Sequence, residues 1–421
     1  MSQQVAPVAL ADLQRPVASE LERVADELRR IIAADFPVIA DVNEHLLRMK
    51  GKLFRPTLLL LSYRASGADD ARAVTLAAVV ELIHLATLVH DDSVDHSVLR
   101  RGMPTINALF SHQVAVIMGD YLYSRAIIEL VRLDDLAPLR VFARVTNEMT
   151  VGEMRQLEAH DKLAYDEAQY DQLIRSKTAS LLSGACEVGA LGAPVPYREA
   201  LARFGMRLGM AFQITDDLLD YTEPEAVTGK PSGLDLKEHK VTLPLIAALA
   251  AMGPAQRRLV AELMATPDPG DAVVAEVVRL VETAGGLDYA RRRALQLAQQ
   301  AEAELEILPP SPARDAYTTA SPMPWNGAAK PVARGHRGPL FYMGFLAGGF
   351  VLGGLLHALL RRFLPQGAAK EFFTTAVTPT FGPVHLDLLV VSVTLGPIGF
   401  DVSLLAVVGV AIAYFVARSI F

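Results

Sequence analysis

Apolar residues recur every three or four positions from about residue 17 to residue 308, and this period constrains the fold more than any other feature of the chain. Such spacing places apolar side chains on one face of a helix. Runs that alternate apolar and polar residues, as strands do, are almost absent from this region. Glycine and proline fall between the periodic segments, as at Gly67 and Pro194. The sequence therefore predicts an all-α bundle domain over residues 17–308, after a tail of residues 1–16.

The composition argues against some partners and compartments. A formal net charge of −7 argues against a nucleic-acid partner, because it implies no strongly basic face. The single cysteine, Cys186, excludes an internal disulfide framework and fits a reducing compartment. The first 14 residues lack the basic-then-apolar pattern of a signal peptide, so we expect the bulk of the chain in the cytoplasm.

The composition changes after residue 308. Prolines with scattered alanine and glycine predict an extended linker over residues 309–337, and residues 338–421 form a predicted membrane domain. Residues 339–360 contain no Asp, Glu, Lys or Arg. At 1.5 Å per residue this run spans about 30 Å, the thickness of a bilayer's hydrocarbon.

A second apolar segment, over about residues 400–420, gives a weaker candidate span. A buried helix of a soluble protein is the alternative for both segments. Between them, residues 384–394 alternate enough to predict a strand or hairpin outside the bilayer. Basic residues are nearly balanced between the two sides of the predicted spans, so the positive-inside rule does not settle their orientation.

One short acidic pattern, Asp-Asp-x-x-Asp, occurs at residues 91–95 and again at residues 216–220, each time after an apolar run. On a helix the first and last carboxylates share one face, where two charges about 6 Å apart repel by roughly 3 kcal/mol at an effective dielectric near 20. Magnesium prefers carboxylate oxygens, and when few protein ligands hold it, it also binds substrate phosphates. A single acidic triplet is more often a solvated helix end, but the repeat favours a magnesium–diphosphate site between two helices. The candidate metal ligands are Asp91, Asp92, Asp95, Asp216, Asp217 and Asp220.

Basic side chains stand at ordered positions around both acidic motifs, where they can hold anionic ligands. Any one of them is more often a surface charge, but their joint placement favours binding. The candidates are Lys52, Arg55, His84, Arg100, Arg101, Lys177, Lys230 and Lys240.

These motifs resemble those of the trans-isoprenyl diphosphate synthases, or polyprenyl synthetases, over about residues 15–310. They occur in the family's order as Gly-Lys-x-x-Arg-Pro, His-x(6)-Asp-Asp-x-x-Asp, Arg-Arg-Gly, Gly-Glu-x-x-Gln, Lys-Thr, Phe-Gln-x-x-Asp-Asp-x-x-Asp and Gly-Lys-x-x-Gly-x-Asp-Leu. The resemblance implies an isoprenoid-synthase-type helical bundle around a central cavity and a homodimer. It also implies a magnesium-dependent condensation of isopentenyl diphosphate with an allylic diphosphate, giving a polyprenyl diphosphate and diphosphate.

The resemblance also implies roles for single residues. About three magnesium ions would be held mainly by Asp91, Asp95 and Asp216, with the other three aspartates in support. The allylic diphosphate would be clamped by cations beside Gln213, namely Arg100, Lys177, Lys230 and Lys240. The isopentenyl diphosphate pocket would comprise Lys52, Arg55, His84 and Arg101. Thr178 would lie near the reacting centre.

Product length can be argued from the helix that ends at the first acidic motif. Ala86 and Thr87 lie about one turn before Asp91 and are small, so the growing chain can pass them, and Ile83 is the next candidate stop. Long-chain relatives resemble this Ala-Thr pair. We therefore expect a product of about seven to ten isoprene units, such as a quinone side chain, built on farnesyl or geranylgeranyl diphosphate.

Two other functions compete with this interpretation. A class I terpene cyclase ionises the same kind of substrate, but it usually carries a different second metal motif and does not need Lys52 or Arg55. A non-catalytic or membrane-scaffold subunit of a heteromeric synthase tends to lose acidic or basic positions, and none is missing here.

The C-terminal region resembles a small uncharacterised bacterial family of two-span membrane proteins. We therefore expect the protein to be located at the bacterial cytoplasmic membrane, with its catalytic domain facing the cytoplasm.

Overall fold

The computed structural model describes residues 10–49, 51–67, 72–100, 102–159, 163–222 and 233–320, together with six short strands between residues 376 and 403. The chain divides into two compact units, residues 1–328 and 329–421, and each is described by itself.

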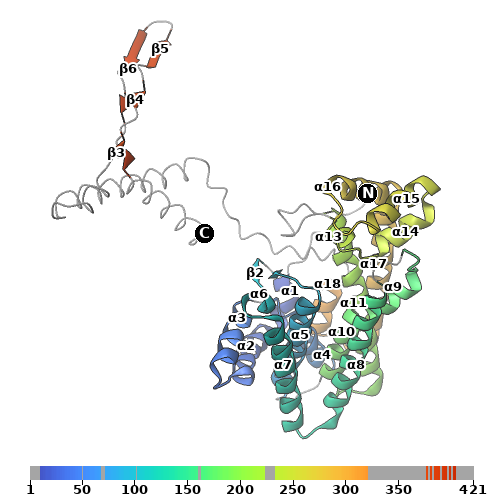
Figure 1. Cartoon of the computed structure of the whole chain (residues 1–421). Helices are drawn as coiled ribbons and strands as arrows, with labels where there is room; N and C mark the ends of the chain where they lie inside the picture. Colours follow the sequence, from blue (N-terminus) through green and yellow to red (C-terminus); the bar gives the residue numbers. More distant parts are fainter. Residues whose placement is uncertain are drawn as a thin grey trace, which may run out of the picture. The chain divides into compact units, whose positions relative to one another are not determined.

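The first unit is a helical bundle (Figure 1), as the apolar period predicts. Its N-terminal half contains α1 (Leu10–Gln14), η1 (Arg15–Val17), α2 (Ala18–Ile32), α3 (Pro37–Arg48), α4 (Phe54–Ala65), α5 (Ala73–Val94), α6 (Ile106–Leu109), α7 (His112–Arg132) and α8 (Leu136–Ala159). A two-stranded hairpin, β1 (Leu99–Arg100) with β2 (Met103–Pro104), lies between α5 and α6. The C-terminal half contains α9 (Glu167–Ile174), η2 (Arg175–Ala179), α10 (Ser180–Gly189), α11 (Val195–Thr222), α13 (Leu234–Lys237), α14 (Leu243–Ala251), α15 (Pro254–Met264), α16 (Asp271–Thr283), α17 (Gly286–Glu304), η3 (Leu305–Ile307) and α18 (Pro312–Ala320).

Helix α5 is the central helix of the bundle and is apolar on nearly all sides. By length and composition alone it would be able to cross a membrane, but 67% of its apolar stretch is buried inside the bundle. A helix that is hydrophobic all round is buried in this way. The first acidic motif therefore stands at the C-terminal end of a rigid core element.

Two apolar cores hold the bundle together, and α11 contributes to both. Phe204 and Leu208 of α11 lie in the first core with α4, α5, α7 and α10. Met210 and Ile214 lie in the second core with α14, α16 and α17. At Gly209, an added Cβ would lie 2.6 Å from the Cα atom of Ala179, so only glycine lets α11 approach η2 this closely. The second acidic motif follows this close contact.

The bundle extends beyond the boundary expected at residue 308. The extended linker predicted from residue 309 is wrong for Pro312–Ala320, which form α18. Tyr317 is fully buried, and its hydroxyl donates to the carbonyl oxygen of Leu58 at 2.5 Å and lies 2.7 Å from Ser62 Oγ in α4. Apolar burial and these hydrogen bonds dock α18 on the bundle.

The described part of the second unit is a β-ribbon. The pairs are β3 (Ala376–Val377) with β8 (Val402–Ser403), β4 (Thr380–Phe381) with β7 (Ile398–Gly399), and β5 (Val384–Leu388) with β6 (Val391–Leu395). The residue pairs of all three strand pairs follow the same antiparallel register, so the three pairs are successive parts of one long hairpin. Of the strand or hairpin expected over residues 384–394, the structure shows the hairpin.

The predicted membrane spans lie almost wholly outside the described residues. This holds for all of residues 339–360 and for most of the segment at about 400–420. Val402 and Ser403 are described, and they form strand β8. A helix starting at about residue 400 is therefore wrong at its first turn.

Candidate functional site

The first acidic motif forms the C-terminal end of α5. Asp91 and Asp92 lie in its last turn, and the N–H of Asp95 donates to the carbonyl oxygen of Asp91 at 2.8 Å. The C-terminus of a helix carries partial negative charge, which adds to the repulsion among these carboxylates. The pKa of Asp91 is raised to about 7, mainly by burial; Glu153 and Asp95 also raise it, whereas Lys177 lowers it. The structure thus concentrates negative charge at one helix end.

The carboxylate of Asp92 forms an ion pair with Arg100 of the neighbouring hairpin. Arg100 Nε lies 2.9 and 2.8 Å from the two carboxylate oxygens of Asp92, and its Nη2 atom donates at 2.7 Å. The Asp92 side chain is 7% exposed and that of Arg100 is 32% exposed. Such a bidentate pair fixes the guanidinium in orientation. Asp92 therefore positions Arg100 beside the first motif.

Lys177 and Thr178 lie in η2, a single π-helical turn. Such turns are rare and are frequent at functional sites. Lys177 Nζ donates to Glu153 and Gln156 of α8 at 3.0 and 2.9 Å, and it lies 3.9 Å from Asp91 Oδ2. At Gly152 an added Cβ would lie 3.0 Å from the backbone nitrogen of Lys177. This glycine brings α8 close enough for its side chains to hold the ammonium group.

The second acidic motif lies on α11 and is tied to the same π-helical turn. Thr178 Oγ1 donates to Gln213 Oε1 at 2.8 Å, and Gln213 Nε2 donates to Asp217 Oδ1 at 2.8 Å. Tyr170 OH donates to the other oxygen of Asp217 at 2.5 Å. Burial raises the pKa of Asp217 to about 7, although the hydrogen bonds from Tyr170 and Gln213 oppose this shift.

The last aspartate of the second motif organises the chain that follows it. The carboxylate of Asp220 accepts from the N–H groups of Leu234 and Asp235 at 3.2 and 3.1 Å. Further along, Lys240 N donates to the carbonyl oxygen of Asp235 at 2.8 Å. Burial opposes the charge on Lys240, but Glu238, Asp235 and Asp95 together raise its pKa above the usual value. Lys240 therefore stands within the electrostatic reach of the first motif.

The structure thus brings the two acidic motifs together through a continuous set of contacts. Asp91 faces Lys177, whose neighbour Thr178 is bonded to Gln213, and Gln213 is bonded to Asp217. These residues come from α5, η2 and α11. The arrangement can bind a polyanion between carboxylates that hold cations and the ammonium group of Lys177.

Of the residues expected to hold a second anion, Arg55 lies on α4, His84 lies on α5, and Lys52 lies just before α4. The ring of Phe54 stacks on Phe212 of α11 with centroids 5.8 Å apart, which places the Lys52–Arg55 segment next to Gln213. Leu53 adopts φ 48°, a strained left-handed conformation of a kind that clusters at binding sites. His84 is half-buried on α5, about two turns before Asp91. Arg101 and Lys230 lie outside the described residues.

The three residues expected to govern product length lie along the buried part of α5. Ile83 and Ala86 are 1% and 2% exposed, and Thr87 is half-buried with its hydroxyl bonded to the carbonyl oxygen of His84. The side chains at positions 86 and 87 are both small, as the expected passage of the growing chain requires.

The carboxylates of the site fit hard divalent cations. Within the described ranges, no three His, Cys, Asp or Glu side chains already converge closely enough to hold an ion. Magnesium needs few protein ligands, since it keeps waters and shares substrate phosphates. Asp92, Asp217 and Asp220 accept protein hydrogen bonds, whereas Asp95 and Asp216 are exposed. Burial is the main cause of the raised pKa of Asp91, and the neighbouring charges of Glu153 and Asp95 also raise it; a cation would relieve this crowding of negative charge.

A model of the polyprenyl synthetase family matches residues 36–281, more than half of the chain. The chain belongs to the polyprenyl synthetase family. Residues 370–416 match a separate domain of unknown function, DUF4321. The polyprenyl synthetase match confirms the expected all-helical isoprenyl synthase fold and identifies the protein as a prenyltransferase.

Characterised relatives share nearly their whole length with this polyprenyl synthetase. The all-trans-nonaprenyl-diphosphate synthase (geranyl-diphosphate specific) of Rhodobacter capsulatus is 41% identical over 72% of this chain and 94% of the relative. The octaprenyl diphosphate synthase of Haemophilus influenzae is 35% identical over 72% and 93%. The crystal structure of polyprenyl synthase from Caulobacter crescentus CB15, complexed with calcium and isoprenyl diphosphate, aligns with a TM-score of 0.73 and 33% identity over 76% and 98%.

Some residues of this polyprenyl synthetase's site were missed by the sequence reasoning. Glu153 and Gln156 belong to the Gly-Glu-x-x-Gln motif, which marked these positions without giving them a role, and the structure pairs both side chains with Lys177. Tyr170 lies 47 positions before Asp217, and no local pattern marks it. Asp235 is half-buried, and the desolvation of its carboxyl, together with the charges of Asp217 and Asp220, raises its pKa well above the usual value.

Proposed function

We propose that the protein is a long-chain trans-polyprenyl diphosphate synthase that condenses isopentenyl diphosphate with an allylic diphosphate. The contact set from Asp91 through Lys177, Thr178 and Gln213 to Asp217 carries this proposal, because it unites both acidic motifs with one ammonium group. The names of the nonaprenyl and octaprenyl relatives support a long product, as do the small residues Ala86 and Thr87.

Asp91, Asp95 and Asp216 would hold about three magnesium ions together with the diphosphate oxygens. When bound, the metal supplies charge neutralisation to the departing diphosphate. Asp92, Asp217 and Asp220 would support this set by fixing Arg100, Gln213 and the chain at residues 233–235.

The basic residues divide between the two substrates. Lys177, Lys240, Arg100 and Lys230 would bind the allylic diphosphate, and Lys52, Arg55, His84 and Arg101 would bind isopentenyl diphosphate. The allylic carbon–oxygen bond breaks, and its electron pair leaves with the diphosphate, which the lysines stabilise. The isopentenyl double bond then attacks the allylic cation, and a proton passes to a diphosphate oxygen. Holding both substrates in place supplies a large part of the rate.

The decisive experiment uses purified full-length protein, magnesium and labelled isopentenyl diphosphate, with geranyl, farnesyl or geranylgeranyl diphosphate as primer. We expect label in a linear polyprenyl diphosphate, with product length read by reversed-phase chromatography after dephosphorylation. A cyclic hydrocarbon formed without isopentenyl diphosphate would identify a terpene cyclase. Incorporation that requires a second protein would identify a non-catalytic subunit.

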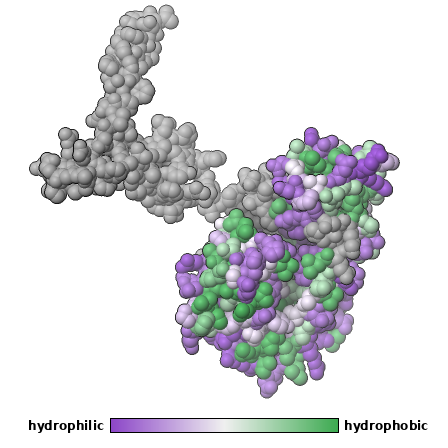
Figure 2. All heavy atoms as spheres, viewed as in Figure 1, coloured by the Kyte–Doolittle hydropathy of each residue, from purple (hydrophilic) through white to green (hydrophobic). Residues whose placement is uncertain are grey.

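The protein is proposed to form a homodimer through α7 and the chain before it. Ile117 and Val131 of α7 are 62% and 61% exposed, and Figure 2 shows several hydrophobic patches among hydrophilic residues on one face of the bundle. Contiguous exposed apolar residues mark interfaces more often than free surface. Other exposed apolar residues of this region are Val98, Leu99, Leu109, Phe110, Val116 and Ile128. Light scattering should give a dimer for the wild type and a smaller species for Ile117→Asp.

The C-terminal region is proposed to tether the synthase to the cytoplasmic membrane, with the catalytic domain facing the cytoplasm where its charged substrates are. The apolar run of residues 339–360 supports this proposal. A tether would release an insoluble product directly into lipid. The full chain should sediment with membranes, and a chain truncated after residue 328 should not. Equal solubility of the two would contradict the tether.

A further inference from the structure

The carbonyl oxygen of Lys52 precedes α4, and that helix has no backbone donor for it. In a helix this oxygen would accept from the N–H of the residue four positions later. That residue is Pro56, which has no N–H to donate. The donor must therefore come from water or from another part of the chain.

Gln14 supplies this donor from the N-terminal end of the bundle. Its side-chain nitrogen Nε2 donates to Lys52 O at 2.8 Å and to Thr57 Oγ1 at 3.1 Å. Both N–H groups of the amide are used in this way. Gln14 is the last residue of α1 and is half-buried, and the side chain before it, Leu13, is fully buried. Burial of Leu13 thus keeps the amide of Gln14 at the start of α4.

Thr57 extends the same set of contacts to Leu53. Its hydroxyl donates to Leu53 O at 2.7 Å, and its backbone N–H donates to the same oxygen at 2.9 Å. Leu53 adopts φ 48°, a conformation that a non-glycine residue keeps only where its surroundings impose it. Gln14 and Thr57 impose it by bonding two successive carbonyl oxygens. The turn that they fix carries Lys52 directly before Leu53 and Arg55 two positions after it.

The element that carries Gln14 packs against the last described helix of the same unit. Helix α1 and the η1 turn both contact α18. Helix α18 is in turn bonded to α4, because Tyr317 OH donates to Leu58 O. The two ends of the bundle therefore meet beside α4, and Gln14 bonds the first turn of that helix.

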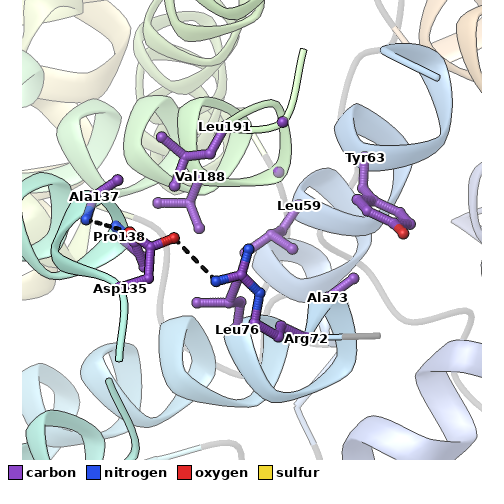
Figure 3. Close-up of a pocket in the computed structure, with 12 residues that line it drawn as sticks. Leu59, Tyr63, Arg72, Ala73, Leu76, Asp135, Ala137, Pro138, Val188 and Leu191 are labelled. Carbon is purple, nitrogen blue, oxygen red and sulfur yellow. Dashed lines mark hydrogen bonds and ion pairs between the residues drawn. The ribbon is translucent and has the colours of Figure 1, made fainter. Parts of the chain in front are cut away.

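The packing of α4 is interrupted on another of its sides. Leu59 and Tyr63 line a cavity of about 260 Å³ that α5, α8 and the chain at the end of α10 also border (Figure 3). Atoms around a void lose dispersion contacts, so this side contributes less to the position of α4. The contacts of α4 with α1 and α18 are correspondingly more important for the placement of its N-terminal turn.

We propose that Gln14 is a positioning residue for isopentenyl diphosphate. It acts through the carbonyl oxygen of Lys52 and the hydroxyl of Thr57, and it fixes the turn from which Lys52 and Arg55 reach the substrate. The inference rests on the proposed synthase activity and on the assignment of these two basic residues to isopentenyl diphosphate.

The test measures steady-state kinetics of full-length variants, with each substrate varied in turn. Gln14→Met keeps the length of the side chain but removes both N–H donors. It should raise KM for isopentenyl diphosphate by about two- to tenfold, the effect of a lost hydrogen bond. The KM for the allylic primer and the kcat at saturating isopentenyl diphosphate should stay near the wild-type values, because the altered turn belongs to one substrate only.

The matched control is Gln256→Met in α15. Gln256 is also half-buried, and its side chain bonds the backbone N–H of Gly253 at 2.9 Å, outside the site. This control should leave both KM values unchanged. Thr57→Val should raise KM for isopentenyl diphosphate as Gln14→Met does, whereas Thr57→Ser keeps the hydroxyl and should stay near the wild type. If Thr57→Val fails to fold, Gln14→Met decides alone.

The outcomes separate this inference from the synthase proposal. Wild-type turnover with an unchanged KM for isopentenyl diphosphate in Gln14→Met would overturn the inference alone. Equal changes in kcat and in both KM values would also overturn it, because they would indicate a general loosening of the fold. A wild type that incorporates no isopentenyl diphosphate would reject the synthase proposal, and the inference would fall with it.

Discussion

The hydroxyl of Thr178 donates a hydrogen bond of 2.8 Å to the amide oxygen of Gln213. This contact joins the π-helical turn that faces the first acidic motif to the helix that carries the second. The amide nitrogen of Gln213 in turn holds Asp217. A change at Thr178 should therefore affect both motifs.

Thr178→Val keeps the shape of the side chain but removes this donor. A hydrogen bond contributes about 0.5–1.5 kcal/mol net, so we expect kcat to fall by about two- to tenfold. Thr178→Ser retains a hydroxyl and should stay near the wild-type rate. Steady-state kinetics with labelled isopentenyl diphosphate would measure both. Equal rates for the valine and serine variants would show that the contact has no catalytic role.

Arg100→Met should destabilise the fold as well as the site. It leaves the buried Asp92 carboxylate without its bidentate partner, at a cost of about 3 kcal/mol in the free energy of unfolding. The double variant Arg100→Met with Asp92→Leu should recover most of this stability without recovering activity. Urea unfolding gives the stabilities. A double variant no more stable than the single one would contradict this account.

Magnesium binding should depend on pH through Asp91 and Asp217. Their pKa values are raised to about 7, so the folded protein holds protons that the unfolded chain releases near pH 4. Stability of the metal-free protein should therefore fall as pH rises from about 4 to 7. Metal binds the deprotonated carboxylates, so the rise in Tm on adding magnesium should be larger at about pH 8 than at pH 6. Calorimetry would test this, and Asp91→Asn should weaken the dependence.

Ala86→Phe should shorten the product. Ala86 is 2% exposed and lies about one turn from Asp91, so a benzyl group there would block the growing chain early. Chromatography of the dephosphorylated products would show the shift. Ala86→Ser adds one atom and should leave product length unchanged. An unaltered length in the phenylalanine variant would reject the assignment of Ala86.

Tyr317→Phe tests the docking of α18. The variant removes the hydroxyl that bonds Leu58 O and lies 2.7 Å from Ser62 Oγ, so buried polar groups lose a partner. We expect a loss of about 1–3 kcal/mol in the free energy of unfolding. Thermal unfolding would measure it. Tyr289→Phe, at a partly exposed tyrosine bonded to Glu167, serves as a control and should change stability much less.

Local spacing was sufficient to predict the helical bundle and both acidic motifs. It was not sufficient for Tyr170, because its bond to Asp217 depends on how α9 packs against α11. Helix α18 was missed because its prolines were interpreted as a linker. Yet Ser311 followed by Pro312 is a helix-start signal, and Ser311 Oγ accepts from Arg314 N at 3.2 Å. Arg101 and Lys230 keep their expected roles as predictions.

The contacts of Asp220 have an evolutionary consequence. Its carbonyl oxygen accepts from Gly233 N, and its carboxylate accepts from the next two N–H groups. The chain therefore departs from α11 and comes back to the same aspartate. Insertions or deletions between residues 223 and 229 should leave Lys240 in place, so the number of residues there can drift among descendants of this gene as long as Lys230 keeps its distance from Gly233.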